Sequence, residues 1–136
     1  MATTEHCVIP LHLETGTDDP IALRGVFGYR SDRPYEVSLD FHGGGMILAR
    51  WVFARDLLLD GQVQATGQGD IRVWPAWRAF EPRVMLAFSN GQQDGVVSAR
   101  AKDVRRLGRR MTSLVPRGQE GRYYDLDAEL STLLPR

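Results

Sequence analysis

Hydrophobic and polar residues alternate at residues 7–14 and 35–41, a pattern that predicts strands with one buried face. Two further strands are predicted at residues 22–29 and 46–53, and turn-forming residues separate the four stretches. In the first stretch Pro10 predicts an edge strand, because proline cannot donate a hydrogen bond to a neighbouring strand. Before the fourth stretch, three glycines at residues 43–45 predict the tight turn of a hairpin.

The pattern changes to that of a helix at residues 54–60, where three leucines follow one another and Gly61 caps the end. Because so short a helix is unstable alone in water, we expect it to pack on the sheet or on a neighbouring subunit. Residues 51–53 are expected to be the buried end of the preceding strand. Trp51 and Phe53 should point the same way, since side chains alternate along a strand.

Three further strands are predicted in the second half of the chain, at residues 71–74, 83–89 and 95–100. Apolar residues then recur at intervals of three and four from Val104 to Val115, which predicts a helix that Pro116 stops. A last helix is predicted from Asp125, which suits its N-terminus. This order predicts an α+β fold with antiparallel sheets of about seven strands, a short mid-chain helix and two C-terminal helices, in a single domain spanning residues 1–136.

The composition is that of a globular protein and does not favour general nucleic-acid binding. Basic and acidic residues number 17 each, so the formal net charge is zero, whereas phosphate binding usually requires an excess of positive charge. Cys7 is the single cysteine, which excludes an intramolecular disulfide and a multi-cysteine metal site. The chain shows neither a signal-peptide pattern nor an apolar run long enough to span a membrane, so we expect a cytoplasmic location.

Enzymatic chemistry finds little support in the sequence. Residues 42–45 read His-Gly-Gly-Gly, which forms an oxyanion hole in some esterases, but no serine lies in the Gly-x-Ser-x-Gly context of a nucleophile. We interpret these glycines as a turn that uses positive φ. The three histidines lack the spacing of metal ligands, and Gly67-x-Gly69 lacks the third glycine of a dinucleotide loop. No catalytic, metal-binding or cofactor-binding residue is predicted.

Two segments are candidates for binding a partner. From Arg72 to Arg83, basic and aromatic residues interleave, and Trp74 and Trp77 could stack on single-stranded bases. The favoured alternative is that these tryptophans pack in a core or subunit interface while the arginines face solvent. The second segment, residues 100–117, has seven basic residues against one acidic residue. Five of them lie away from the apolar stripe of the predicted helix and could meet an acidic partner: Lys102, Arg105, Arg106, Arg109 and Arg110.

Several stretches resemble one known family. "WVFARDLLLDG" at residues 51–61 and "GQGDIRVWP" at residues 67–75 resemble the SsgA-like proteins of sporulating actinomycetes. Further matches follow in order over almost the whole chain: "RPYEVSLDFH" at 33–42, "VPRGQE" at 115–120 and "YYDLDAELSTLL" at 123–134. One departure is Gly108, inside a helix where the family often has Phe-Leu-x-Arg-Thr; it predicts a bend or a close packing contact.

The resemblance implies a non-enzymatic regulator or adaptor of sporulation-specific cell division, without a cofactor. It implies contacts with division proteins such as FtsZ or a sister SsgA-like protein, at septum sites. It also implies a homotrimer with the fold of whirly single-stranded-DNA-binding proteins. The alternative function is a single-stranded nucleic-acid-binding module that uses the Trp74–Arg83 segment.

The residues that carry the resemblance are interpreted as scaffold rather than as a ligand site, because the short helix among them must be anchored by tertiary or subunit contacts. These residues are Trp51, Phe53, Arg55, Asp56, Leu57, Gly69 and Asp70.

Overall fold

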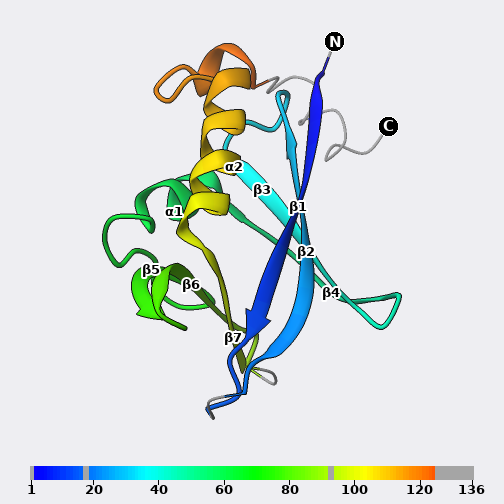
Figure 1. Cartoon of the computed structure of the whole chain (residues 1–136). Coiled ribbons are helices and arrows are strands. Elements are labelled where there is room, and N and C mark those ends of the chain that lie inside the picture. Colours follow the sequence, from blue (N-terminus) through cyan, green and yellow to red (C-terminus); the bar gives the residue numbers. More distant parts are fainter. Residues whose placement is uncertain (1, 17–18, 92–93, 125–136) are drawn as a thin grey trace.

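One curled sheet organises the protein, whose structure, a computed structural model, describes residues 2–16, 19–91 and 94–124. All seven strands run antiparallel to their neighbours, in the order β4-β3-β2-β1-β7-β6-β5. The helices lie on one side of the curled sheet (Figure 1). The strands are β1 (Thr4–Leu13), β2 (Ile21–Arg30), β3 (Glu36–Gly43), β4 (Met46–Ala54), β5 (Ile71–Arg78), β6 (Glu81–Ser89) and β7 (Asp94–Arg100).

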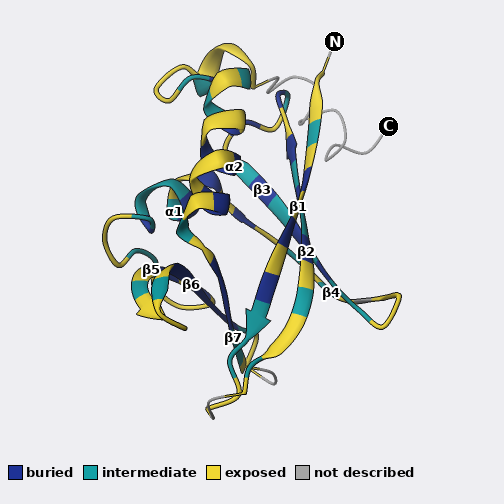
Figure 2. Ribbon diagram, viewed as in Figure 1, coloured by how far each residue is buried: buried dark blue, intermediate teal, exposed yellow. Residues whose placement is uncertain are grey.

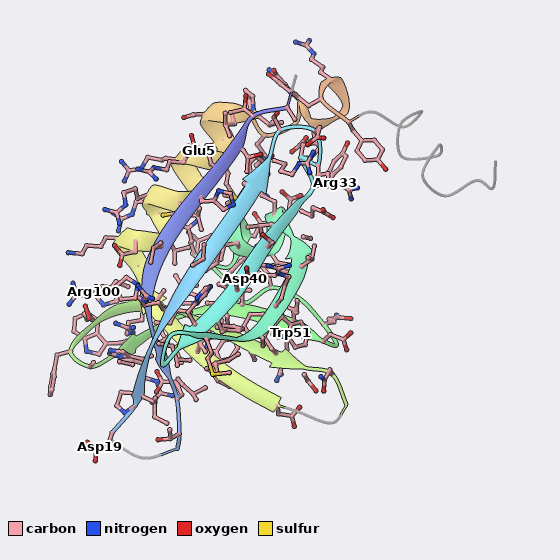
Figure 3. The ribbon with its side chains drawn as sticks, turned by 90° about the vertical axis from the view of Figure 1, so that its right-hand side faces the viewer. Glu5, Asp19, Arg33, Asp40, Trp51 and Arg100 are labelled. Carbon is pink, nitrogen blue, oxygen red and sulfur yellow. The ribbon has the colours of Figure 1, made fainter. Side chains whose placement is uncertain are left out.

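The four strands predicted in the first half of the chain are present, and the alternation predicted for residues 7–14 and 35–41 is confirmed. In β3, Val37, Leu39 and Phe41 are buried. Asp40 points to the outer face, where it pairs with Arg50 at 2.6 Å (Figure 3). Tyr35 differs from the prediction: it precedes β3 and is 52% exposed. The seven predicted strands thus form one continuous sheet with an apolar inner face and a polar outer face.

Two helices cover part of the inner face. The predicted mid-chain helix is α1 (Arg55–Asp60), and the predicted basic helix is α2 (Ala101–Leu114), which starts three residues before Val104. A short 3-10 helix, η1 (Glu120–Arg122), follows and was not expected from the sequence. The helix predicted from Asp125 lies outside the described residues.

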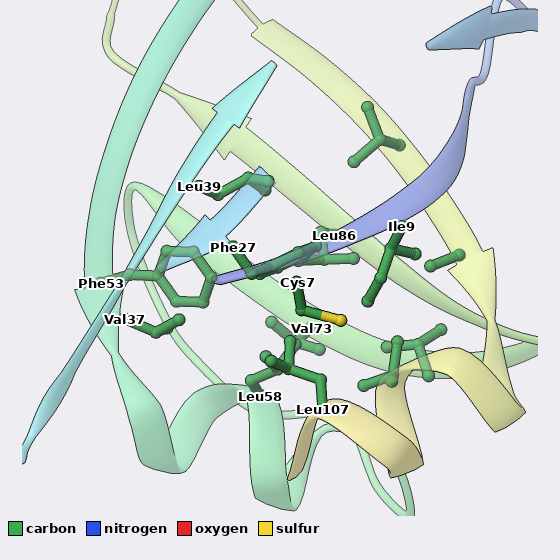
Figure 4. Close-up of a cluster of buried hydrophobic side chains, with 14 of the residues drawn as sticks. Cys7, Ile9, Phe27, Val37, Leu39, Phe53, Leu58, Val73, Leu86 and Leu107 are labelled. Carbon is green, nitrogen blue, oxygen red and sulfur yellow. The ribbon is translucent and has the colours of Figure 1, made fainter. Parts of the chain in front are cut away.

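The hydrophobic core fills the space between the sheet and the helices (Figure 4). Leu58 of α1 and Leu107 of α2 pack there with Phe27, which is fully buried. Burial of each such side chain contributes about 1.5–3 kcal/mol to the stability of the fold. Trp51 and Phe53 both contact Phe88, with ring centroids 5.0 and 6.0 Å apart, so they share a face as predicted.

Val52 lies between these two rings and is 53% exposed, so the prediction that residues 51–53 are all buried is wrong. The reason is the strand period itself, which sends the middle side chain to the opposite face. Trp51 is half-buried and Phe53 is buried.

The edge position predicted for Pro10 is also wrong, because β1 lies in the middle of the sheet. Pairing with β7 is limited to His12 and Leu13, so the flank of β1 beside Pro10 has no strand partner on that side. Proline is tolerated where the ladder is interrupted in this way.

β5 is longer than predicted and continues through Pro75 to Arg78. It is an edge strand, where proline removes no hydrogen bond that the sheet needs. β6 correspondingly starts at Glu81, so β5 and β6 are joined by Ala79 and Phe80 alone.

Glycine serves two purposes in this fold. Gly44 and Gly45 have φ values of 58° and 79°, which confirms the predicted turn between β3 and β4. Gly61 caps α1 but has a φ of −65°, so it is needed for space: a Cβ atom would collide with the Val73 side chain. Gly108 confirms the expected close packing, since a Cβ there would lie 3.2 Å from Leu59 Cδ2.

A polar network reinforces the short pairing between β1 and β7. Ser98 Oγ donates a hydrogen bond to Glu14 Oε1 at 2.9 Å, and Arg83 Nε donates to the same Ser98 Oγ at 2.8 Å. Arg83 is 3% exposed and also contacts the Ser98 carbonyl and Glu81. The two halves of the sheet, β4-β3-β2-β1 and β7-β6-β5, are therefore joined by side chains as well as by backbone.

Candidate protein-interaction surfaces

The basic face of α2, defined as Lys102, Arg105, Arg106, Arg109 and Arg110, is exposed along the helix. The opposite face carries Val104, Leu107 and Met111, all buried in the core, and Figure 2 shows this division along α2. Asp103 is the acidic residue of the helix, and Arg106 binds it at 3.2 Å. The predicted segregation of charge is confirmed, and a partner for this face stays a prediction.

The Trp74–Arg83 segment does not form a single basic and aromatic surface. Trp74 and Trp77 are three positions apart in a regular strand, so their side chains leave opposite faces of β5. Trp77 is 68% exposed, so it does not pack in the core of this chain, whereas Trp74 is half-buried. The expectation that the arginines face solvent is wrong for Arg83, because Ser98 and Glu81 hold it in the sheet.

The tip of the β5–β6 hairpin is an exposed aromatic site, and its ring belongs to Phe80, one of the interleaved aromatic residues of the Arg72–Arg83 segment. Ala79 and Phe80 have φ values of 52° and 61°, a left-handed conformation that costs non-glycine residues about 1–3 kcal/mol each. Phe80 is 94% exposed. Backbone strain of this kind clusters at functional sites. The turn carries no glycine signal, because Ala79 and Phe80 occupy the positions where glycine is usual.

Arg55, in the first family stretch, is buried in the interior with 1% of its side chain exposed. Its Nη1 atom donates to the Tyr29 hydroxyl at 2.9 Å and to the Val115 carbonyl at 2.7 Å. Its Nη2 atom donates to Glu120 Oε1 at 2.7 Å. We call this cluster of Arg55, Tyr29, Val115 and Glu120 the buried junction, because it ties β2 and α1 to the segment after α2.

Electrostatics at the buried junction favour an ionised carboxylate and a neutral phenol. Hydrogen bonds from the backbone N–H groups of Glu120 itself and of Gly118 lower the pKa of Glu120, and Arg55 lowers it further. Burial raises the pKa of Tyr29, although Arg55 acts in the opposite direction. The Tyr29 hydroxyl donates to the Pro34 carbonyl at 2.9 Å, which leaves its oxygen free to accept from Arg55.

A second arginine holds the same segment from outside. Arg117 Nη2 binds Asp60 Oδ1 at 2.5 Å and Asp56 Oδ1 at 3.6 Å, so both acidic residues of α1 face it. Asp56 lies at the start of α1, as predicted, and it also pairs with Arg117 of the segment after α2. The matched stretches at 51–61 and 115–120 meet here, a contact that sequence spacing alone could not indicate.

The other residues assigned to the scaffold lie where their chemistry is structural. Leu57 is half-buried and packs against the core. Gly69 has a φ of 79° in the loop before β5, and the Asp70 carbonyl accepts a hydrogen bond from the Ser89 N–H at 2.8 Å. The scaffold role of these residues stays a prediction that substitutions can test.

In the described part of the chain, no group of three or more His, Cys, Asp or Glu side chains is placed to hold a metal ion. No helix among the described residues is long and apolar enough to cross a membrane. His42 lies in β3 beside the bulge at Phe41, next to the glycine turn.

Known proteins share both the sequence and the fold. The family model described as "Streptomyces sporulation and cell division protein, SsgA" matches residues 21–120. The sporulation-specific cell division protein SsgB of Streptomyces coelicolor is 36% identical over 134 residues, which cover 98% of each chain. SsgB of Thermobifida fusca is 34% identical over 129 residues, covering 95% of this chain and 94% of the relative.

Two solved structures are similar along most of their length. One, from work on SsgB mutations that correlate to longitudinal cell division during sporulation of Streptomyces coelicolor, has a TM-score of 0.87 at 33% identity and covers 91% of this chain and 98% of that one. The SsgA-like sporulation-specific cell division protein of Thermobifida fusca has a TM-score of 0.85 at 34% identity, covering 98% and 97%. The chain therefore belongs to the SsgA family of sporulation and cell division proteins.

Proposed function

We propose that the protein is a non-enzymatic adaptor that places or activates FtsZ-type division machinery at septum sites through protein contacts. Its relatives are sporulation-specific cell division proteins, which supports a role in division. The finer proposal includes action as a homo-oligomer, with a trimer as the expected size.

The observation that carries the proposal is the basic face of α2. Four arginines and one lysine are exposed on one side of a helix whose other side is fixed in the core. A fixed, one-signed surface attracts an acidic partner and speeds its association. The buried junction holds the residue that follows α2, Val115, so the helix presents this face without needing to reorganise.

The test is binding of the purified chain to purified FtsZ-type protein from the same organism, measured by interferometry. Arg105→Glu with Arg109→Glu should weaken binding at least tenfold, because the face loses two positive charges and gains two negative ones. The matched control is Arg24→Glu with Arg122→Glu, which makes the same charge change at two exposed arginines outside α2.

Equal losses in both double variants, or no binding by the unmodified chain, would contradict the proposal. Binding of a labelled oligonucleotide at physiological salt, with a slope of log affinity against log salt of about −0.7 for each phosphate contacted, would favour the single-stranded nucleic-acid alternative. The placement of Trp74 and Trp77 on opposite faces of β5 argues against that alternative.

A further inference from the structure

The tip of the β5–β6 hairpin and an apolar hollow at the other end of β6 are complementary in size and charge. We propose that the tip of one copy inserts Phe80 into the hollow of a second copy, so that copies join head to tail. The inference rests on the proposal that the protein acts as an oligomer, and it identifies the two surfaces that would join the copies.

The hollow has a volume of about 260 Å³ and opens at the end of the sheet interior. Its walls include Leu23, Leu48, Trp51, Phe88 and Val97, and none of the residues that line it comes from α1 or α2. The helices therefore leave this end of the apolar inner face uncovered, and Leu48 is 57% exposed there. Apolar cavities of about 150 Å³ hold a benzene molecule, so this hollow can hold a phenyl ring.

The hairpin tip supplies such a ring. Phe80 is 94% exposed and Trp77 is 68% exposed, so two large aromatic side chains project from the same end of the hairpin. The left-handed backbone at Ala79 and Phe80 makes the turn a tight two-residue connection. A compact tip with an exposed ring fits an apolar hollow better than it fits a flat polar surface.

Charge favours the same pairing. Asp94 is the charged residue among the described residues that line the hollow, and it is exposed. Arg78 is exposed beside the tip. Within the described residues neither side chain has an ion-pair partner, so insertion of the tip would give each of them one.

The two surfaces cannot meet within one copy. Phe80 precedes β6 and Phe88 lies near its end, so they are roughly 25 Å apart at about 3.3 Å per residue. Figure 3 shows Arg100, which pairs with Glu81 beside the tip, and Trp51 of the hollow on opposite sides of the molecule. A contact between two different surfaces leaves one free tip and one free hollow, so it continues until a ring closes or a filament forms.

Analytical ultracentrifugation of the full chain tests the pairing. Phe80→Ser should weaken self-association at least tenfold, and the control Val63→Ser, at an apolar residue 79% exposed elsewhere, should leave it unchanged. Gly95→Leu should have the same effect as Phe80→Ser, because a Cβ there meets no atom within 4 Å and the side chain would occupy the hollow. If Gly95→Leu fails to fold, Leu48→Arg on the exposed wall replaces it.

Mixing the two variants gives the sharpest result. The Phe80→Ser chain keeps its hollow and the Gly95→Leu chain keeps its tip, so the mixture should form one-to-one dimers although each variant alone stays monomeric. Asp94→Arg should weaken assembly, and adding Arg78→Asp to it should restore it.

This inference is overturned if the Phe80→Ser chain self-associates as strongly as the wild type, or if the mixture of the two variants stays monomeric. Either result would leave the proposal of an oligomer intact. A wild-type chain that is monomeric at about 1 mM overturns both the inference and the proposal of an oligomer.

Discussion

Arginines occupy two neighbouring regions of the protein, and their surroundings give them different tasks. In the buried junction, Arg55 is 1% exposed and donates to a phenol, a backbone carbonyl and a carboxylate. On the basic face of α2, the arginines are exposed, and the ion pair of Arg106 with Asp103 is the one seen there among the described residues. An arginine is therefore structural where hydrogen-bond acceptors from distant segments surround it, and is available to a partner where they do not. The residue type alone does not distinguish the two.

The largest loss of stability is expected when a core side chain is removed in β4, just before Arg55. Phe53→Ala should lower the free energy of unfolding by about 4 kcal/mol, because Phe53 is buried and its ring contacts Phe88. Urea unfolding followed by circular dichroism measures the change. Unchanged stability combined with loss of partner binding would instead make this segment a docking surface.

Arg55→Met tests the buried side of the comparison directly. We expect the free energy of unfolding to fall by about 3 kcal/mol, at the lower end of the range for a broken buried ion pair. The loss is at the lower end because the Glu120 carboxylate keeps its hydrogen bonds from the Gly118 N–H and can be hydrated. The control is Arg24→Met, at an exposed arginine of β2, which should change the unfolding free energy by less than about 0.5 kcal/mol. Equal losses in the two variants would remove the distinction between buried and exposed arginines.

Acid titration shows how much of the junction depends on charge. The pKa of Glu120 is lowered in the folded protein, so its carboxylate stabilises the fold at pH values above the unfolded pKa of about 4.3. This contribution is lost as the pH falls through the folded pKa. Glu120→Gln should therefore lower the thermal midpoint at pH 7, and the difference from the wild type should shrink as the pH falls below about 4.3. A difference that stays constant with pH would show that the side chain acts through packing or neutral hydrogen bonds.

The smallest effect on stability is expected on the exposed side. Arg105→Glu with Arg109→Glu should shift the unfolding free energy by less than about 0.5 kcal/mol at each site, since neither side chain is fixed by a contact among the described residues. Differential scanning calorimetry measures it. A drop comparable to that of Arg55→Met would mean that the basic face is structural and is not available to a partner.

The contrast between β3 and β5 shows which parts of the fold can be predicted from sequence. β3 alternates regularly because one face is buried along its whole length, so its residues reveal both its type and its orientation. β5 passes through a proline and ends at a two-residue turn without glycine, so local rules end it too early. Pro75 is tolerated because β5 lies at the edge of the sheet. The position of a strand in its sheet cannot be predicted from the residues of that strand alone.

The candidate sites divide in the same way. The basic face of α2 follows from helical spacing, since charges and apolar residues separate on a regular period. The burial of Arg55 depends on acceptors 60 and 65 positions away, at Val115 and Glu120, and no local pattern encodes such a contact. The exposure of Phe80 depends on where the core ends, which only the packed sheet determines.

The short pairing between β1 and β7 has a consequence for how the chain folds. Strands β1 to β4 form from consecutive hairpins, and so do β5 to β7, so each group needs only contacts between neighbours in sequence. The pairing of β1 with β7 is different, because it joins segments that are distant in the sequence. Glu14 and Ser98 are 84 positions apart, and β1 pairs with β7 only at His12 and Leu13. Ordering a loop of this length costs entropy before any contact offsets it, so we expect closure of the two meanders to be the slow step of folding.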